Sequence, residues 1–126
     1  MREILFKGKH FVSRITIYGY YFVLNGVHYI GNDEGTYRVE PETVGQYTGL
    51  NDKTILGIFE GDIVRCNRFA CDKEDMVGYI VYSDCGFCVK DHKSPNMPAM
   101  DLCDDFEVIG NLHDNPELLE VGGDGK

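Results

Sequence analysis

Long hydrophobic runs are missing from this sequence of 126 residues. The longest one, Tyr18–Leu24, has seven residues, whereas a helix that crosses a bilayer needs about 20. The first residues, Met1–Lys7, place charges on both sides of a three-residue apolar patch, and an export signal needs roughly 7–15 apolar residues. We therefore expect a soluble cytosolic protein with no membrane contact.

Positive charge is also scarce. Twelve Lys and Arg residues stand against 21 Asp and Glu residues, which gives a formal net charge of −9 and a pI near 4.7. A field of this sign repels phosphate groups and anionic lipids. The composition therefore disfavours a protein that coats nucleic acid or a membrane surface.

The charge is unevenly distributed along the chain, and this leaves one alternative open. Residues 1–32 carry Arg2, Lys7, Lys9 and Arg14 against Glu3, whereas residues 101–126 carry eight acidic residues against one lysine. Aromatic side chains such as Tyr18 and Tyr20 can stack on bases while nearby cations meet phosphates. A nucleic-acid binding module that uses the basic N-terminal segment is therefore the alternative to a protein-binding role, for which the acidic C-terminal end is also a candidate surface.

The usual signatures of catalysis are absent. The sequence has no phosphate-binding loop, no His-Glu-x-x-His zinc motif, no dinucleotide fingerprint and no Gly-x-Ser-x-Gly elbow. The four histidines, His10, His28, His92 and His113, are scattered rather than spaced as metal ligands. Asp62 and the pair Asp104 and Asp105 follow turns or precede strands, where carboxylates usually accept hydrogen bonds from backbone amides. We therefore predict a non-enzymatic protein with no catalytic residue and no cofactor.

The five cysteines leave a second alternative. Structural disulfides are disfavoured in the cytosol, and an odd number leaves one thiol unpaired within the chain. Cys66 with Cys71, and Cys85 with Cys88, could supply the four thiolates of a zinc site. However, Cys66 lies in phase with Val64 on a predicted strand and Cys88 lies between Phe87 and Val89, where a small buried hydrophobic residue fits equally well. We expect buried or half-buried thiols, with a metal-binding protein as the alternative.

Long helical periodicity is absent as well, and short strands with turns between them take its place. Turns recur every eight to twelve residues, which is typical of an all-β sandwich or barrel. The length and the hydrophobic content of 43% fit one domain. The sequence thus predicts one all-β domain over residues 1–121, with a strongly bent sheet or small barrel. A short helical turn near Asn115–Leu119 and a frayed tail at residues 122–126 complete the prediction.

The longest predicted strand, Ile15–Leu24, is apolar on both faces. Alternation places Tyr18, Tyr20, Phe22 and Leu24 on one face and Ile15, Ile17, Tyr21 and Val23 on the other. Asn25-Gly26 then predicts a type I′ hairpin that returns the chain along Val27–Ile30. A strand that is apolar on both faces is either buried on both or shares one with a partner subunit, so we expect a homo-oligomer.

Five blocks, which together extend nearly from end to end of the sequence, carry a resemblance to a known family. They are Arg2–Lys9, Val39–Leu50, Ile58–Val64, Glu107–Asn111 and Asn115–Leu119. The resemblance is to the YopX family of phage and prophage proteins. It implies a small β-rich protein of phage or prophage origin, with no recognised catalytic residue or cofactor. We accordingly expect an accessory protein that contacts a host or phage protein in the cytoplasm of the bacterial host.

The sequence departs from the family pattern at one turn. Where the family has Asp-Lys-Asn-Gly, this chain has Asp52-Lys53-Thr54-Ile55, which lacks the Asn-Gly pair that favours a tight turn. We expect a wider connection at this point. Further along, Asp62 follows Gly61, and we expect its carboxylate to cap backbone amides of the preceding turn.

Overall fold

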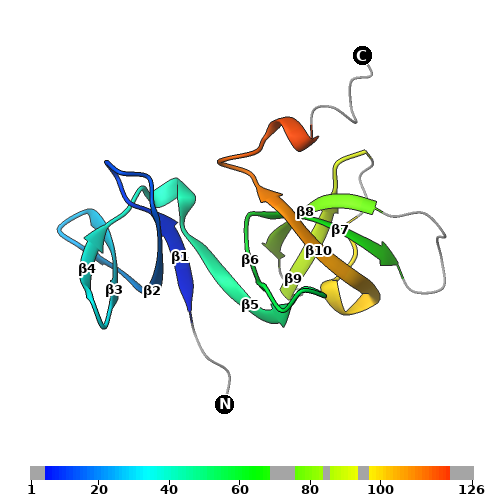
Figure 1. Ribbon diagram of the computed structural model, residues 1–126, viewed down its shortest axis with the longest axis horizontal. Helices are drawn as coiled ribbons and strands as arrows, with labels where there is room; N and C mark the ends of the chain where they lie inside the picture. The colour runs from blue at the N-terminus through cyan, green and yellow to red at the C-terminus, as the bar shows by residue number, and fades with distance from the viewer. Residues whose placement is uncertain (1–4, 69–75, 84–85, 94–96, 120–126) are drawn as a thin grey trace. The chain divides into compact units, whose positions relative to one another are not determined.

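The structure is a computed structural model that describes residues 5–68, 76–83, 86–93 and 97–119. Its strands form two antiparallel sheets with the hydrogen-bonded orders β4-β3-β2-β1-β5-β6 and β10-β7-β8-β9 (Figure 1). The strands are β1 (Phe6–Lys9), β2 (Thr16–Leu24), β3 (Val27–Asn32), β4 (Gly35–Arg38), β5 (Gly45–Asn51), β6 (Gly57–Phe59), β7 (Asp62–Arg68), β8 (Met76–Ser83), β9 (Gly86–Asp91) and β10 (Cys103–Asn111). Two short 3₁₀ helices, η1 (Pro41–Thr43) and η2 (Met100–Leu102), precede β5 and β10.

The chain divides into two compact units, residues 1–49 and residues 50–126, which we call the N-terminal and C-terminal units. The boundary falls within β5, which pairs with β1 through residues 45 and 46. A single domain over residues 1–121 stays a prediction. The predicted frayed tail, residues 122–126, lies outside the described residues.

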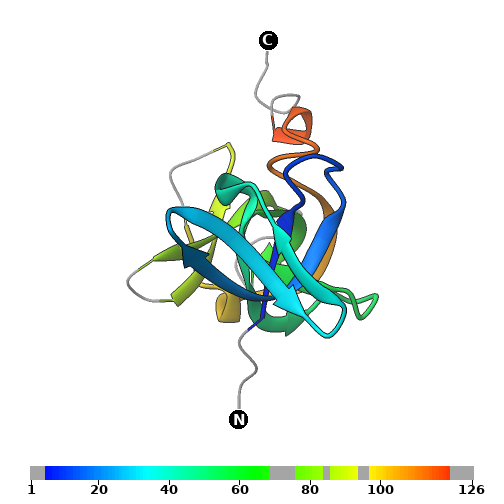
Figure 2. The same cartoon turned by 90° about the vertical axis from the view of Figure 1, so that its left-hand side faces the viewer.

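The sheet of the N-terminal unit is strongly bent. β2 pairs with β1 through Thr16–Gly19 and with β3 through Tyr20–Leu24. Beyond β4 the chain returns to the end of β1, where the amide of Glu40 donates to the carbonyl of Lys9 at 2.9 Å. The described strands form a bent sheet rather than a closed barrel (Figure 2), which confirms the all-β prediction and the first of its two shapes.

Few hydrophobic residues are buried in the described part of this bent sheet. Ile30 and Val39 are the buried hydrophobic residues in the described part of the N-terminal unit. Gly8 makes room for them, since a Cβ atom there would lie 3.2 Å from the Ile30 Cδ1 and 3.3 Å from the Val39 Cβ. A Cβ atom on Gly19 would lie only 2.3 Å from the carbonyl oxygen of Gly31. The bend therefore depends on glycines that let neighbouring strands approach closely.

The predicted β2–β3 hairpin is confirmed. Asn25 and Gly26 have φ values of 52° and 78°, as a type I′ turn requires, and Leu24 pairs with Val27 directly across it. β1 continues to Lys9, because residues 6–9 are all paired with β2.

The C-terminal unit is built around a continuous hydrophobic core. Its members come from β6, β7, β8, β9, η2 and β10, the elements labelled in the green-to-orange part of Figure 1. They include Ile58, Val64, Cys66, Met76, Ile80, Val89, Met100, Cys103 and Phe106. After β10, the amides of Leu118 and Leu119 donate to the carbonyls of Asn115 and Pro116, which confirms the predicted helical turn.

The turn between β5 and β6 is tight, so the expected wider connection is wrong. The amide of Ile55 donates to the carbonyl of Asp52 at 2.9 Å, and the amide of Asp52 donates to the carbonyl of Leu56 at 2.7 Å. Ile55 adopts a φ of 74°, which is unfavourable for a β-branched residue. The turn therefore persists without its Asn-Gly pair, with Ile55 in a backbone conformation that suits glycine.

The helices of the described residues are short. No helix among them combines the length and the apolar character that a membrane span requires.

Candidate binding surface

One face of β2 exposes several large side chains of the N-terminal unit to solvent, and we call it the outward face. It consists of Tyr18, Tyr20, Phe22 and Leu24, which are 48%, 64%, 41% and 57% exposed. Strand alternation places all four side chains on the same side of the sheet. Each carries a large apolar group into solvent, where a side chain of this kind gains free energy by contact with another molecule.

Neighbouring strands extend the outward face in both directions. On β3, the Tyr29 ring stacks on Phe22 with ring centroids 5.4 Å apart, and Val27 pairs directly with Leu24. On β1, Lys7 pairs with Tyr18 in the register, so the sheet also presents a cation beside the first tyrosine. The result is a mainly aromatic surface with a basic margin.

On the opposite face of β2, Tyr21 contacts other side chains of the same unit. The Tyr21 hydroxyl is hydrogen-bonded to His28 Nδ1 at 2.6 Å, and the Tyr21 ring lies 5.4 Å from that of Phe6. Val23 and Ile15 on this side are nevertheless 49% and 62% exposed. The predicted two-sided apolar strand is thus present, and the outward face is its more exposed and more aromatic side.

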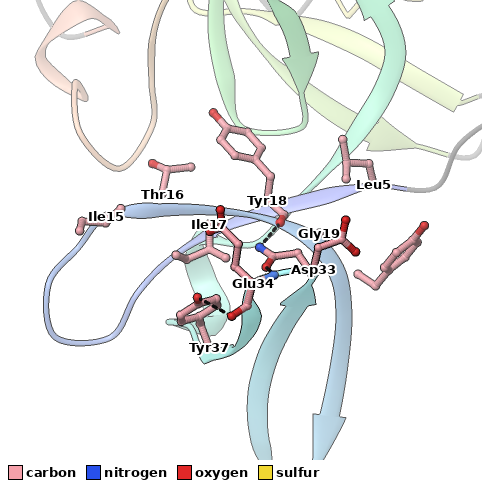
Figure 3. Close-up of a pocket in the computed structure, with 11 residues that line it drawn as sticks. Leu5, Ile15, Thr16, Ile17, Tyr18, Gly19, Asp33, Glu34 and Tyr37 are labelled. Atoms are coloured by element: carbon pink, nitrogen blue, oxygen red, sulfur yellow. Dashed lines mark hydrogen bonds between the residues drawn. The ribbon is translucent and has the colours of Figure 1, made fainter.

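A pocket of about 600 Å³ lies at the beginning of β2, within the N-terminal unit. Residues 15–20, at and just before the beginning of β2, form part of its lining together with Leu5, which precedes β1. Asn32 at the end of β3, and Asp33 and Glu34 in the turn before β4, form another part (Figure 3). Tyr37 of β4 completes the lining. The pocket combines apolar walls with two carboxylates on one rim.

Hydrogen bonds fix the turn that forms this rim. The side-chain amide of Asn32 donates to the carbonyl of Tyr18 at 2.9 Å, and its Oδ1 accepts from the amide of Glu34 at 2.8 Å (Figure 3). The Tyr37 hydroxyl donates to the Glu34 carbonyl at 3.3 Å. These bonds hold the backbone of the turn and leave the carboxylates of Asp33 and Glu34 without an ion pair among the described residues.

The proposed zinc ligands are only partly described. Cys71 and Cys85 lie outside the described residues, so the zinc alternative stays untested. Cys66, Cys88 and Cys103 are buried, and Cys66 and Cys103 belong to the hydrophobic core, as expected for structural thiols. Cys88 Sγ lies 3.3 Å from Ser83 Oγ.

Three of the four histidines form separate hydrogen bonds in different parts of the structure. Nδ1 of His10 accepts hydrogen bonds from the amides of Val12 and Ser13 at 3.2 and 3.1 Å, which closes the turn after β1. His28 pairs with Tyr21, and His92 Nδ1 lies 2.8 Å from the carbonyl of Val77. Among the described residues, no group of three His, Cys, Asp or Glu residues is arranged to hold a metal ion.

Two of the three carboxylates singled out in the sequence, those of Asp62 and Asp104, accept hydrogen bonds from backbone amides. The buried Asp62 accepts from the amide of Phe59 at 2.8 Å, so the expected capping role is confirmed. Asp104 accepts from the amide of Asp105 at 2.8 Å. None of these three residues lies in the lining of the pocket.

Sequence reasoning missed the most highly connected carboxylate, Asp52. Its Oδ1 accepts from the amides of Thr54 and Leu56 and from the Thr54 hydroxyl, and its Oδ2 accepts from the amide of Val108 at 3.0 Å. Burial raises the pKa of Asp52, but these hydrogen bonds outweigh it and lower the pKa to about 2. Asp52 therefore fastens the β5–β6 turn to β10, and its place before a turn was the only sequence signal for it.

No pattern in the sequence predicted the pocket, because the polar segment Gly31–Gly35 indicates only a loop. Asn32 and Glu34 reach the pocket because the hairpin between β3 and β4 brings them beside the beginning of β2. That approach also depends on the register of the β3–β4 hairpin, and its turn at Asp33 and Glu34 lacks the Asn-Gly pair that specifies the β2–β3 hairpin.

Comparisons with known proteins agree with this architecture. A crystal structure of protein EF1440 from Enterococcus faecalis is similar to this chain with a TM-score of 0.58 and 23% sequence identity, over 95% of this chain and 100% of that chain. At this identity the similarity supports the fold alone. A search of curated proteins finds no match. The family model described as YopX protein matches residues 2–120, nearly the whole chain, and this protein therefore belongs to the YopX family.

Proposed function

We propose that this protein is a non-enzymatic accessory protein of phage or prophage origin that acts through protein contacts in the bacterial cytoplasm. The observation that carries the proposal is the outward face, on which four large side chains of β2 are 41–64% exposed. Contiguous exposed apolar patches on small proteins commonly mark sites of protein association. Tyrosine and phenylalanine are also enriched in such interfaces.

The charge distribution supports a protein partner rather than nucleic acid. Residues 1–49 contain five Lys and Arg residues and five Asp and Glu residues, whereas residues 50–126 contain seven and sixteen. The unit that carries the outward face is thus formally neutral, and the whole excess of acid lies in the other unit. A neutral aromatic surface gains little from phosphate neutralisation, which dominates binding to nucleic acid.

A homo-oligomer is the simplest form of such a contact. Two copies that pair through the outward face would cover Tyr20, Phe22 and Leu24 in a symmetric interface. Sedimentation velocity at high micromolar concentration should therefore show a dimer or larger species for the wild type. A monomer under these conditions would remove self-association from the proposal.

The direct test is capture from a lysate of host cells after nuclease treatment, with the bound proteins identified by mass spectrometry. The variant Phe22→Ala/Leu24→Ala truncates the outward face, and Tyr82→Ala/Leu102→Ala removes an exposed aromatic and an exposed leucine side chain from the C-terminal unit as a matched control. We expect wild type and control to retain the same protein and the outward-face variant to retain at least about fivefold less, as for loss of contacts worth 1 kcal/mol or more.

The same experiment separates the second candidate function, nucleic-acid binding. Lys7 beside Tyr18 on the outward face is the observation in its favour, since the two side chains suit a phosphate and a base. Recovery of nucleic acid alone from an untreated lysate, with loss at moderate salt, would overturn the protein-binding proposal and favour this second candidate.

A further inference from the structure

The pocket of the N-terminal unit lies along a strand edge that the sheet leaves open. β1 covers one side of β2 from Thr16 to Gly19, whereas β3 covers the other side only from Tyr20 onward. Within the described part of the chain, no strand pairs with the β3 side of Thr16 and Ile17, and the pocket lies there instead. An edge of this kind can pair with an extended segment of another chain by backbone hydrogen bonds.

The rim of the pocket defines the charge of such a segment. Asp33 and Glu34 are both exposed, and neither forms an ion pair with a described residue. None of the described residues that line the pocket is a lysine or arginine. A cationic side chain that enters beside β2 would therefore meet two acidic residues and no competing cation from the described part of the chain, which favours a basic segment over an acidic one.

The remaining lining suits the hydrocarbon part of a long basic side chain. Ile15, Ile17 and Leu5 provide apolar walls, and Tyr37 adds an aromatic ring next to the rim (Figure 3). Lysine and arginine pack their aliphatic stems on apolar surfaces while their charged ends remain near water. An aromatic ring also attracts a cation that approaches its face.

We propose that this groove binds an extended segment of a partner protein, and that the segment presents a lysine or arginine side chain to Asp33 and Glu34. The proposal rests on the proposed function, since it specifies how the partner is recognised. The outward face supplies apolar contact area, whereas the groove selects a partner strand of the correct charge.

The test uses the full-length protein labelled with ¹⁵N and three capped pentapeptides, Thr-Val-X-Val-Thr, in which X is arginine, citrulline or glutamate. Citrulline has nearly the same shape as arginine but no charge. We expect the arginine peptide to produce saturable shifts of the amide signals of residues 15–18 and 32–34, with an affinity about fivefold higher than that of the citrulline peptide. The glutamate peptide should bind more weakly than either.

Two variants assign the effect to the rim. Asp33→Asn/Glu34→Gln should reduce the affinity for the arginine peptide to that of the citrulline peptide. Glu42→Gln removes an exposed acid of the same unit that lies outside the pocket lining and should leave the affinity unchanged. Equal binding of the arginine and citrulline peptides, or no shift at millimolar peptide, would overturn the proposal. Stronger shifts of the same amides by an oligothymidine would overturn it in favour of a nucleic-acid ligand.

The two proposals fail in different ways. If Asp33→Asn/Glu34→Gln captures the same lysate protein as the wild type, with equal yield, the groove does not select the partner and the proposed function stands. If wild-type protein captures no protein after nuclease treatment, the proposed function fails even where the arginine peptide binds.

Discussion

Among the described residues, the C-terminal unit buries twelve hydrophobic residues, whereas the N-terminal unit buries Ile30 and Val39 and exposes eight large hydrophobic side chains. Burial of apolar surface is the main favourable contribution to folding. The hydrophobic core of the C-terminal unit therefore stabilises that unit. The N-terminal unit keeps much of its apolar surface available for contact with another molecule.

The backbone shows the same contrast. In the C-terminal unit the turn between β5 and β6 is fastened to β10 through the carboxylate of Asp52. In the N-terminal unit the β2–β3 hairpin ends in the exposed residues Asn25 and Gly26, with Val23 and Leu24 half exposed beside them. A buried side chain thus links distant segments of the C-terminal unit, whereas a hairpin of the N-terminal unit ends in exposed residues.

The largest expected effect compares one substitution in each unit. Ile80→Ala, at a residue 1% exposed in the core of the C-terminal unit, should lower the free energy of unfolding by about 2–5 kcal/mol. Leu24→Ala, at a residue 57% exposed, should change it by no more than about 0.5 kcal/mol. Urea denaturation of both variants checks this, and a similar loss for Leu24→Ala would break the comparison.

The next effect concerns acid stability. Because the pKa of Asp52 in the folded protein, about 2, lies below its ordinary value of 3.8, its ionised form stabilises the fold. This contribution is fully present above about pH 4 and is lost as the pH falls toward 2; it amounts to about 1–2 kcal/mol after allowance for solvent screening.

Asp52→Asn isolates this contribution from those of the other carboxylates. The difference in the free energy of unfolding between wild type and variant, measured by urea denaturation, should shrink between pH 4 and pH 2. A difference that stays constant over this range would show that the Asp52 carboxylate has no depressed pKa.

The smallest expected effect is a gain in stability. Ile55 has a φ of 74° and is 81% exposed, so Ile55→Gly relieves an unfavourable backbone conformation and removes few contacts. The free energy of unfolding should rise by about 1 kcal/mol. Ile55→Ala keeps the Cβ atom and should gain less than half as much. If Ile55→Gly destabilises the protein in thermal or urea denaturation, the turn is not strained.

Local patterns in the sequence predicted most of the strands. The alternating, β-branched and aromatic run at Ile15–Leu24 and the Asn25-Gly26 pair specify β2 and its hairpin through strand propensity and turn chemistry alone. The buried positions of Cys66 and Cys88 also followed from their apolar neighbours. These features depend on residues close together in the chain.

Features that depend on distant residues were not predictable in the same way. The division into two units and the bond from Val108 to Asp52 require the arrangement of segments far apart in sequence, and the pocket beside β2 requires the register of two successive hairpins. At Ile55 the residue type argued against a tight turn, but the hydrogen bonds to Asp52 compensate for it. The tertiary structure therefore overrode a local preference.

Hydrogen exchange measured by mass spectrometry, on the free protein and with its captured partner, tests the division between the two units most directly. In the free protein we predict the slowest exchange in β7 and β8, which lie in the buried core. Partner binding should slow exchange in β2 and β3 and leave β7 and β8 unchanged. Protection by the partner confined to residues 50–119, or slowest exchange in β2 and β3 of the free protein, would contradict the account.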